Sequence, residues 1–421
     1  MKLKNIAKLI LGLYVVAVFS PNLTSVLDLN TFRLLSFSIV NAISLLFLIS
    51  YNELSDALSK VVKSKISIVS VAFILWALAS YFYALNSTEV IVRSFTFINF
   101  YLLYLNLSVL LGYVNLKKIN ITFLISLLLL GQITVSYYSY FQIIEFKAYD
   151  FELNNLLLGI FSNRNVTSAV YLLQVPFVIY TIINSSSKFI RNFCVLILLA
   201  TLFLIFLLAS RTAYLILLAL LLFYLFHLIK NRINILKFNK SAFGILIISL
   251  LITYTTSVYT LGQDNSSNAI SRIQTIDFNE ESTNNRLRYY GYAFEQVKSN
   301  PLIGVGYGNW KIVSVEKDKK NIISYIVPYT MHNDFLEILV ELGLFGLLMY
   351  SFIILFPLYN HRFEIFDNKG NEFGLILASS LVIFIIDSNI NFPALRMSTL
   401  FYLALILSLF YINKFKLNES N

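Results

Sequence analysis

Residues 192–229 read NFCVLILLATLFLIFLLASRTAYLILLALLLFYLFHLI, and this stretch decides the class of fold. Its two apolar runs, near 192–209 and 212–229, are each about as long as a helix that crosses a hydrocarbon core of about 30 Å. A short polar turn that contains Arg211 separates them. Because backbone polar groups inside a bilayer must be hydrogen-bonded, the pattern predicts two membrane-spanning helices joined by a tight turn.

Apolar runs of this kind recur along the whole chain. Of its 421 residues, 58% are hydrophobic and only 13% are charged, whereas a soluble domain usually has about 25% charged residues. We therefore expect an all-α polytopic membrane protein with about 12 transmembrane helices, in a single membrane domain over residues 1–421. The predicted spans lie near residues 6–20, 34–50, 66–84, 90–112, 119–140, 166–183, 192–209, 212–229, 242–260, 335–358, 374–390 and 397–413.

Lysines and arginines are distributed unevenly between the two sides of this arrangement. Positive charge is retained on the cytoplasmic side of short connecting segments, so we expect both termini in the cytoplasm and residues 261–332 as one long extracytoplasmic loop with short helices. The net charge of +10 then reflects topology and attraction to membrane lipids, and no nucleic-acid partner is expected. The few basic residues of the short outer segments are Arg33, Lys147, Arg164, Arg211 and Arg396.

Three arginines near the outer ends of the spans are candidates for substrate binding. Arg211 lies in the turn between the seventh and eighth spans, Arg93 about one helical turn inside the fourth span, and Arg164 at the start of the sixth. At the depth of Arg93 a charge is costly without a partner or a polar cavity. Snorkelling to lipid phosphate is an alternative for Arg211 and for Arg93. Asn163 precedes the sixth span and is expected to cap its helix.

Within the long loop, aromatic and basic residues recur at helical spacing through Arg286, Arg288 and Tyr290. This pattern is typical of a helix that lies in the plane of the membrane interface. Residues 300–310, which follow, contain closely spaced glycines. Glycine-rich turns that bind dinucleotides follow a strand, and no strand pattern precedes this one, so it is only a weak indication of a nucleotide site.

The loop rejoins the membrane at His332-Asn333-Asp334, and His332 is the only histidine that the predicted topology places outside the cytoplasm. Glu337 and Glu341 follow on one face of the next helix. An imidazole with a pKa close to neutral can accept a proton from a reacting hydroxyl group. Asp334, Glu337 or Glu341 could orient it or replace it, and a hydrogen-bonded histidine at a helix entry stays open as the alternative.

These residues resemble the signature of the superfamily of O-antigen ligases and O-antigen polymerases, which are bacterial envelope glycosyltransferases. The resemblance covers residues 150–360. Its motifs are Gly159-Ile-Phe-Ser-Asn163-Arg-Asn165, Ser210-Arg211, Arg286, Asn300-Pro301-Leu-Ile-Gly304-Val-Gly306, His332-Asn333 and Glu341-Leu-Gly343 with Gly346.

The resemblance implies a glycosyltransferase C-type enzyme of the bacterial cytoplasmic membrane. Such an enzyme moves a glycan from an undecaprenyl-diphosphate carrier to a hydroxyl of a glycan, lipid or protein acceptor, in lipopolysaccharide, capsule or exopolysaccharide assembly. By the same resemblance, Arg211 and Arg286 bind the diphosphate and His332 acts at the reaction centre. Tyr290 stands where the family usually has Trp and Arg288 is a second cation, so which arginine faces the substrate stays open.

The chemistry of this transfer agrees with these residue types. Arginines neutralise the charge that grows on a diphosphate leaving group, and a histidine takes the proton of the attacking hydroxyl, with inversion at the anomeric carbon. No metal ion or other cofactor is expected. The further candidates for substrate binding are Arg93, Asn163, Arg164, Arg288, Tyr290, Asn333 and Glu341.

Other functions stay open at this point. A repeat-unit polymerase of the same superfamily uses the same donor as a ligase, and a nonenzymatic scaffold would not need the histidine or the arginines. A transporter or flippase of lipid-linked sugar should concentrate polar residues near the bilayer midplane, often in repeated halves. In this chain the unusual charges lie near the outer ends of spans and in one loop, so an enzyme is favoured.

Overall fold

The computed structural model describes residues 2–20, 29–145, 157–161, 163–229, 236–261, 281–322, 329–362 and 371–418. Within these ranges every regular element is a helix. The long apolar helices confirm the predicted class, an all-α polytopic membrane protein. Lys147 and residues 262–280 at the beginning of the predicted loop lie outside the described residues.

Each of the twelve predicted spans falls on a helix. Ten of the described helices are long and apolar enough to cross a membrane, while α1 has 17 residues and the apolar part of α17 is Met397–Asn413. The helices that carry the predicted spans are α1 (Lys2–Val18), α2 (Leu29–Ile49), α4 (Lys65–Ala79), α5 (Ser87–Val114), α6 (Lys118–Glu145), α7 (Arg164–Asn184), α8 (Lys188–Leu208), α9 (Arg211–Ile229), α10 (Leu236–Leu261), α14 (Asp334–Asn360), α16 (Glu372–Ile390) and α17 (Met397–Asn418).

Five further helical elements carry none of the predicted spans. The helix predicted around Arg286 is present as α12, and α13 follows the glycine-rich segment. These elements are α3 (Asn52–Val62), η1 (Ser80–Phe82), α12 (Glu281–Ser299), α13 (Trp310–Asp318) and η4 (Pro393–Leu395).

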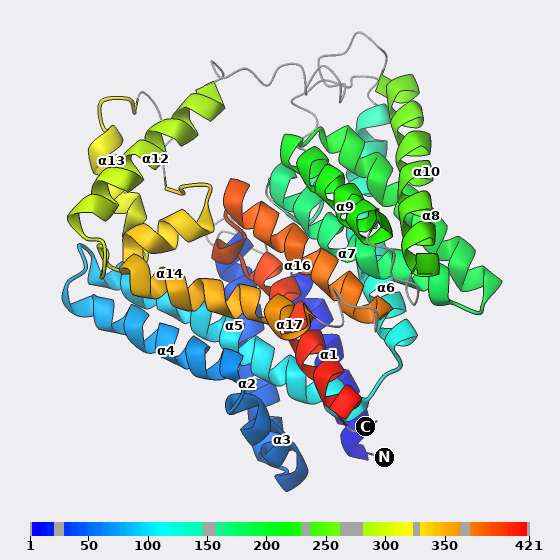
Figure 1. The fold of residues 1–421 in the computed structure, drawn as a ribbon, viewed down its shortest axis with the longest axis horizontal. Coiled ribbons are helices and arrows are strands. Elements are labelled where there is room, and N and C mark those ends of the chain that lie inside the picture. The colour runs from blue at the N-terminus through cyan, green and yellow to red at the C-terminus, as the bar shows by residue number, and fades with distance from the viewer. Residues whose placement is uncertain are drawn as a thin grey trace.

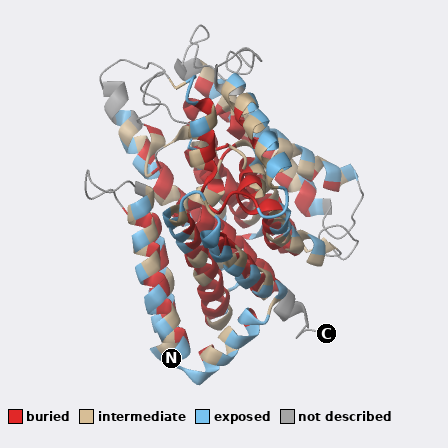
Figure 2. Cartoon of the chain, turned by 90° about the vertical axis from the view of Figure 1, so that its left-hand side faces the viewer, coloured by how far each residue is buried: buried red, intermediate tan, exposed pale blue. Residues whose placement is uncertain are grey.

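The bundle has a buried interior (Figure 2), and many of the side chains exposed on its outside are apolar. The central helices α5 and α7 are buried along most of their length, and α17 and α16 pack against them. Large apolar side chains on the outer helices are exposed, for example Leu46 at 68% and Leu9 at 67%. Soluble proteins rarely expose apolar surface so widely, so this surface is suited to lipid.

The two ends of the bundle differ. Both chain termini lie at one end together with α3, while α12 and α13 lie at the other end (Figure 1). That these two ends face opposite sides of a membrane stays a prediction. Which of the two ends faces the cytoplasm stays a prediction from the charge distribution.

The helix α14 is broken at Gly343, where the backbone adopts φ +66° and ψ −165°. Figure 1 shows the resulting change of direction. Glycine alone adopts such a conformation readily, and a Cβ atom here would lie 2.1 Å from the carbonyl oxygen of Leu302. The span predicted near 335–358 is therefore two helical pieces, a break that the apolar pattern did not predict.

The glycine-rich segment 300–310 fills this break. The N–H groups of Val305 and Gly306 donate to the carbonyl oxygens of Val340 and Glu341, at 3.1 and 2.9 Å. An interrupted helix is tolerated at membrane depth when neighbouring protein satisfies its freed backbone groups. The glycines let the two backbones approach closely, so the motif has a structural role in the described protein.

We predict that Gly343→Ala lowers the stability of the protein, because an L side chain at this φ costs at least about 1–2 kcal/mol before the steric conflict is added. The measurement is the thermal unfolding of the purified protein in detergent. Gly244→Ala in α10 is the matched control, since a Cβ atom there meets nothing within 4 Å. Equal unfolding temperatures for Gly343→Ala and the unchanged protein would show that the break does not depend on glycine.

Candidate active site

The first two turns of α14 carry three buried carboxyl groups, on Asp334, Glu337 and Glu341. Their spacing of three and four residues puts them on one face of the helix. Each carboxylate accepts a hydrogen bond from the backbone of a different segment. The N–H of Ala394 donates to Asp334, that of Met331 to Glu337 and that of Trp310 to Glu341, each at 3.0 Å.

Arg93 of α5 faces these acids. Its Nη2 lies 3.5 Å from Oε1 of Glu337, and its guanidinium carbon lies 5.6 Å from the ring centre of Tyr307. The Arg93 side chain is only 9% exposed, and a buried charge requires such a partner. The sequence predicted that Arg93 needs a partner or a polar cavity, and Glu337 is the partner.

His332 lies directly before these turns, in a left-handed backbone conformation with φ +60°. A non-glycine residue rarely adopts this conformation, and such residues cluster at functional sites. The bond from Met331 to Glu337 fixes the chain just before it, and the hydroxyl of Tyr290 donates to its carbonyl oxygen at 3.4 Å. Its ring packs edge-on against Phe392, with 5.0 Å between ring centres.

The surroundings of His332 keep its imidazole neutral. Burial, together with the positive charges of Arg286 and Arg396, lowers the pKa of His332 to about 4. The sequence led us to expect a pKa closer to neutral, because it did not reveal these neighbours. At neutral pH the ring is therefore unprotonated and able to accept a proton.

Two arginines from distant parts of the chain, Arg286 and Arg396, lie near this histidine, and Arg211 lies near Arg286. Burial lowers the pKa of Arg286, and the nearby charge of Arg211 lowers it further. Arg396 lies beside the same group, with its guanidinium carbon 4.6 Å from the ring centre of Phe392. Sequence reasoning did not select Arg396 as a site residue, although it is one of the few basic residues in the outer segments.

Arg288 lies on the same helix as Arg286 but has a different environment. It forms two hydrogen bonds with the carboxylate of Asp318, Nε to Oδ1 at 2.7 Å and Nη2 to Oδ2 at 3.1 Å. This pair joins α12 to α13, and it lowers the pKa of Asp318 against the effect of burial. Arg286 therefore shares its surroundings with Arg211 and His332, whereas Arg288 is engaged by Asp318.

The two asparagine candidates are helix caps. The Oδ1 of Asn163 accepts from the N–H of Asn165 at 2.8 Å, which confirms the predicted cap at the start of α7, next to Arg164. The Oδ1 of Asn333 accepts from the N–H of Leu336 at 3.0 Å at the start of α14.

The helix starts that carry Arg164 and Arg211 are linked to each other. The hydroxyl of Ser210 donates to Oδ1 of Asn165 at 2.8 Å. This bond joins the beginning of α7 to the beginning of α9, so it fixes where the backbone of Arg211 lies relative to α7.

A cavity of about 1190 Å³ lies beside the His332 segment. Arg93, Glu337 and Glu341 line it. Two other lining residues are close to the site in the sequence: Thr330 lies two residues before His332, and Leu395 lies next to Arg396. Ligand sites in proteins are usually clefts of about 300–1,000 Å³ with a few polar groups among apolar walls. This cavity is therefore large enough for a sizeable ligand, although His332, Arg211, Arg286 and Arg396 are not among the residues that line it.

The fold and these contacts define a polytopic helical membrane protein with a cationic site around one neutral histidine. Residues 194–351, somewhat more than a third of the chain, match the O-antigen ligase family model. The match confirms the resemblance drawn from the motifs, and it includes Arg211, Arg286 and His332. A search of curated proteins finds no significant match to this chain.

The contrast between Arg286 and Arg288 gives a prediction for glycan transfer, the activity expected of this family. Arg286→Lys should lower transfer by at least about tenfold, because a point charge cannot bind two phosphate oxygens in the way that a guanidinium does. Arg288→Lys keeps the charge opposite Asp318 and should retain transfer within about threefold. The measurement is transfer in membranes that contain equal amounts of each protein. The opposite ranking would mean that Arg288 faces the substrate.

Proposed function

We propose that this protein transfers a glycan from an undecaprenyl-diphosphate carrier to an acceptor hydroxyl, at the extracytoplasmic face of a bacterial cytoplasmic membrane. The observation that carries the proposal is a group of cations near a neutral His332. The charges of Arg286 and Arg396 act on its imidazole, and Arg211 lies near Arg286. The match to the O-antigen ligase family supports the general class of reaction.

The donor diphosphate is proposed to bind between Arg211 and Arg286. Burial is the largest cause that lowers the pKa of Arg286, and repulsion from the charge of Arg211 lowers it further. A diphosphate removes this repulsion, and guanidinium groups bind phosphate oxygens in pairs. Arg211 is also the first residue of α9, where the helix dipole favours a negative charge.

In the proposed reaction the acceptor oxygen attacks the anomeric carbon from the side opposite the diphosphate. A new carbon–oxygen bond forms, while the bond to the diphosphate breaks and leaves its electron pair on the phosphate oxygen. The acceptor's proton passes to a ring nitrogen of His332, and the arginines stabilise the leaving group. This geometry inverts the anomeric centre, and the scheme uses no metal ion.

Binding of the donor is also proposed to raise the pKa of His332. Two of the three causes that lower the pKa of His332 are the charges of Arg286 and Arg396. A diphosphate next to these arginines offsets their charge, so the pKa of His332 rises and the imidazole becomes a stronger base. The histidine is then most effective only when a donor is present.

The acceptor is proposed to enter the cavity beside His332. Arg93, Glu337 and Glu341 give this cavity charged hydrogen-bonding groups, as recognition of a glycan requires. The charged groups of the candidate site lie at one end of the bundle, whereas a transporter should concentrate polar groups near the bilayer midplane. We therefore favour an enzyme over a transporter of lipid-linked sugar.

A ligase is the first choice and a repeat-unit polymerase the alternative, since both use the same donor. Glycans from a strain that lacks this protein distinguish them. For a ligase, long chains should accumulate on the lipid carrier. Accumulation of single repeat units instead would identify a polymerase, and unchanged glycans would contradict both.

We predict that His332→Ala leaves the protein folded but lowers transfer by about 10²–10⁴-fold, the usual contribution of a general base. Because the pKa of the free protein is about 4, kcat/KM should fall only as the pH approaches this value, where the imidazole becomes protonated. The acid limb of kcat should lie at higher pH, since the bound diphosphate raises the pKa. Transfer at a nearly normal rate by His332→Gln would rule this base out.

A further inference from the structure

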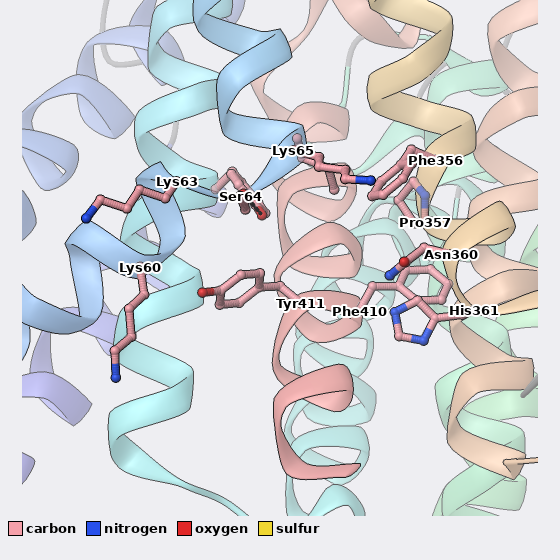
Figure 3. A pocket seen from close by; sticks show the side chains of 12 residues that line it. Lys60, Lys63, Ser64, Lys65, Phe356, Pro357, Asn360, His361, Phe410 and Tyr411 are labelled. Carbon is pink, nitrogen blue, oxygen red and sulfur yellow. Dashed lines mark hydrogen bonds between the residues drawn. The ribbon is translucent and has the colours of Figure 1, made fainter. Parts of the chain in front are cut away.

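A second pocket lies at the opposite end of α14 from His332 (Figure 3). It has a volume of about 320 Å³, and its walls come from the turn between α3 and α4, the last turns of α14, and α5 and α17. From Gly343 to Asn360, α14 advances about 26 Å at 1.5 Å per residue. This is close to the thickness of a hydrocarbon core, so the pocket lies at the other membrane face from the candidate active site.

The rim of this pocket is basic. Lys60, Lys63 and Lys65 are exposed and line it, and its twelve lining residues include no aspartate or glutamate. Among the residues that the structure describes, Lys60 and Lys63 form no ion pair. In Figure 3, Lys65 extends toward Phe356, and its ammonium nitrogen lies 5.6 Å from the centre of that ring. The rim therefore lacks a protein counterion in the described chain.

The wall behind these lysines is aromatic and apolar. Tyr104, Phe356, Phe410 and Tyr411 contribute rings, and Ile66 and Pro357 add aliphatic surface. A free inorganic anion would interact with the lysines but would gain nothing from this wall. A lipid with a phosphate headgroup would use both parts, since its acyl chain buries apolar surface while its phosphate pairs with the lysines.

We propose that this pocket binds the phosphate headgroup of an anionic phospholipid, in the leaflet opposite the candidate active site. Retention of lysine on the cytoplasmic side accounts for basic residues at this end of the bundle. This topological rule does not require three lysines around one cavity whose lining includes aromatic rings and no carboxylate. The assignment is independent of the transfer reaction, because none of the pocket residues belongs to the proposed catalytic machinery.

The test uses the purified full-length protein and compares phosphatidylglycerol with phosphatidylcholine, by native mass spectrometry and by thermal unfolding. The pocket variant combines Lys60→Gln, Lys63→Gln and Lys65→Gln. The matched control combines Lys4→Gln, Lys8→Gln and Lys188→Gln, which remove the same charge from exposed lysines outside the pocket. Size-exclusion chromatography verifies folding, and Lys65→Gln alone serves if the triple variant aggregates.

We expect the unchanged protein and the control to prefer phosphatidylglycerol by at least about tenfold, and the pocket variant to lose most of this preference. Equal losses in both variants would overturn the proposal in favour of general attraction to a charged surface. Stabilisation by inorganic phosphate as large as that by phosphatidylglycerol would also overturn it, because the ligand would then be a free anion.

Discussion

The site depends on three buried carboxylates at the beginning of α14, each of which accepts a backbone N–H from another segment. Glu337 holds the chain next to His332, Asp334 holds the segment that leads to Arg396, and Glu341 holds the start of α13. A hydrogen bond of this kind contributes about 0.5–1.5 kcal/mol to stability. Because Arg93 offsets part of the negative charge, one short helical stretch can position the groups around the histidine.

Features of this protein that follow from local physics could be predicted from the sequence. The bilayer requires long apolar helices, so the apolar runs gave the spans, and the cap at Asn163 follows from its neighbours in the chain. The break at Gly343 could not be predicted, because it is stabilised by backbone groups of residues 300–310, about 40 residues earlier. An apolar run gives no sign of hydrogen bonds that come from outside its own helix.

The same distinction applies to the candidate site. Motifs pointed to His332 and Arg286, but spacing could not separate Arg286 from Arg288, since both lie on one helix. The difference comes from Asp318, which is far away in the sequence and binds Arg288. The low pKa of His332 was not predicted for the same reason. It depends on burial and on the charge of Arg396, which follows α16 and is far from His332 in the sequence.

We propose that Arg211 and Arg286 together bind one diphosphate. A double-mutant cycle tests it most directly, with calorimetric binding of a short-chain polyprenyl diphosphate to Arg211→Ala, Arg286→Ala and the double variant. The account predicts that each single change weakens binding by at least about tenfold, and that the two effects are coupled by at least about 0.5 kcal/mol because both side chains contact one ligand. Unchanged binding in either single variant, or strictly additive losses, would contradict it.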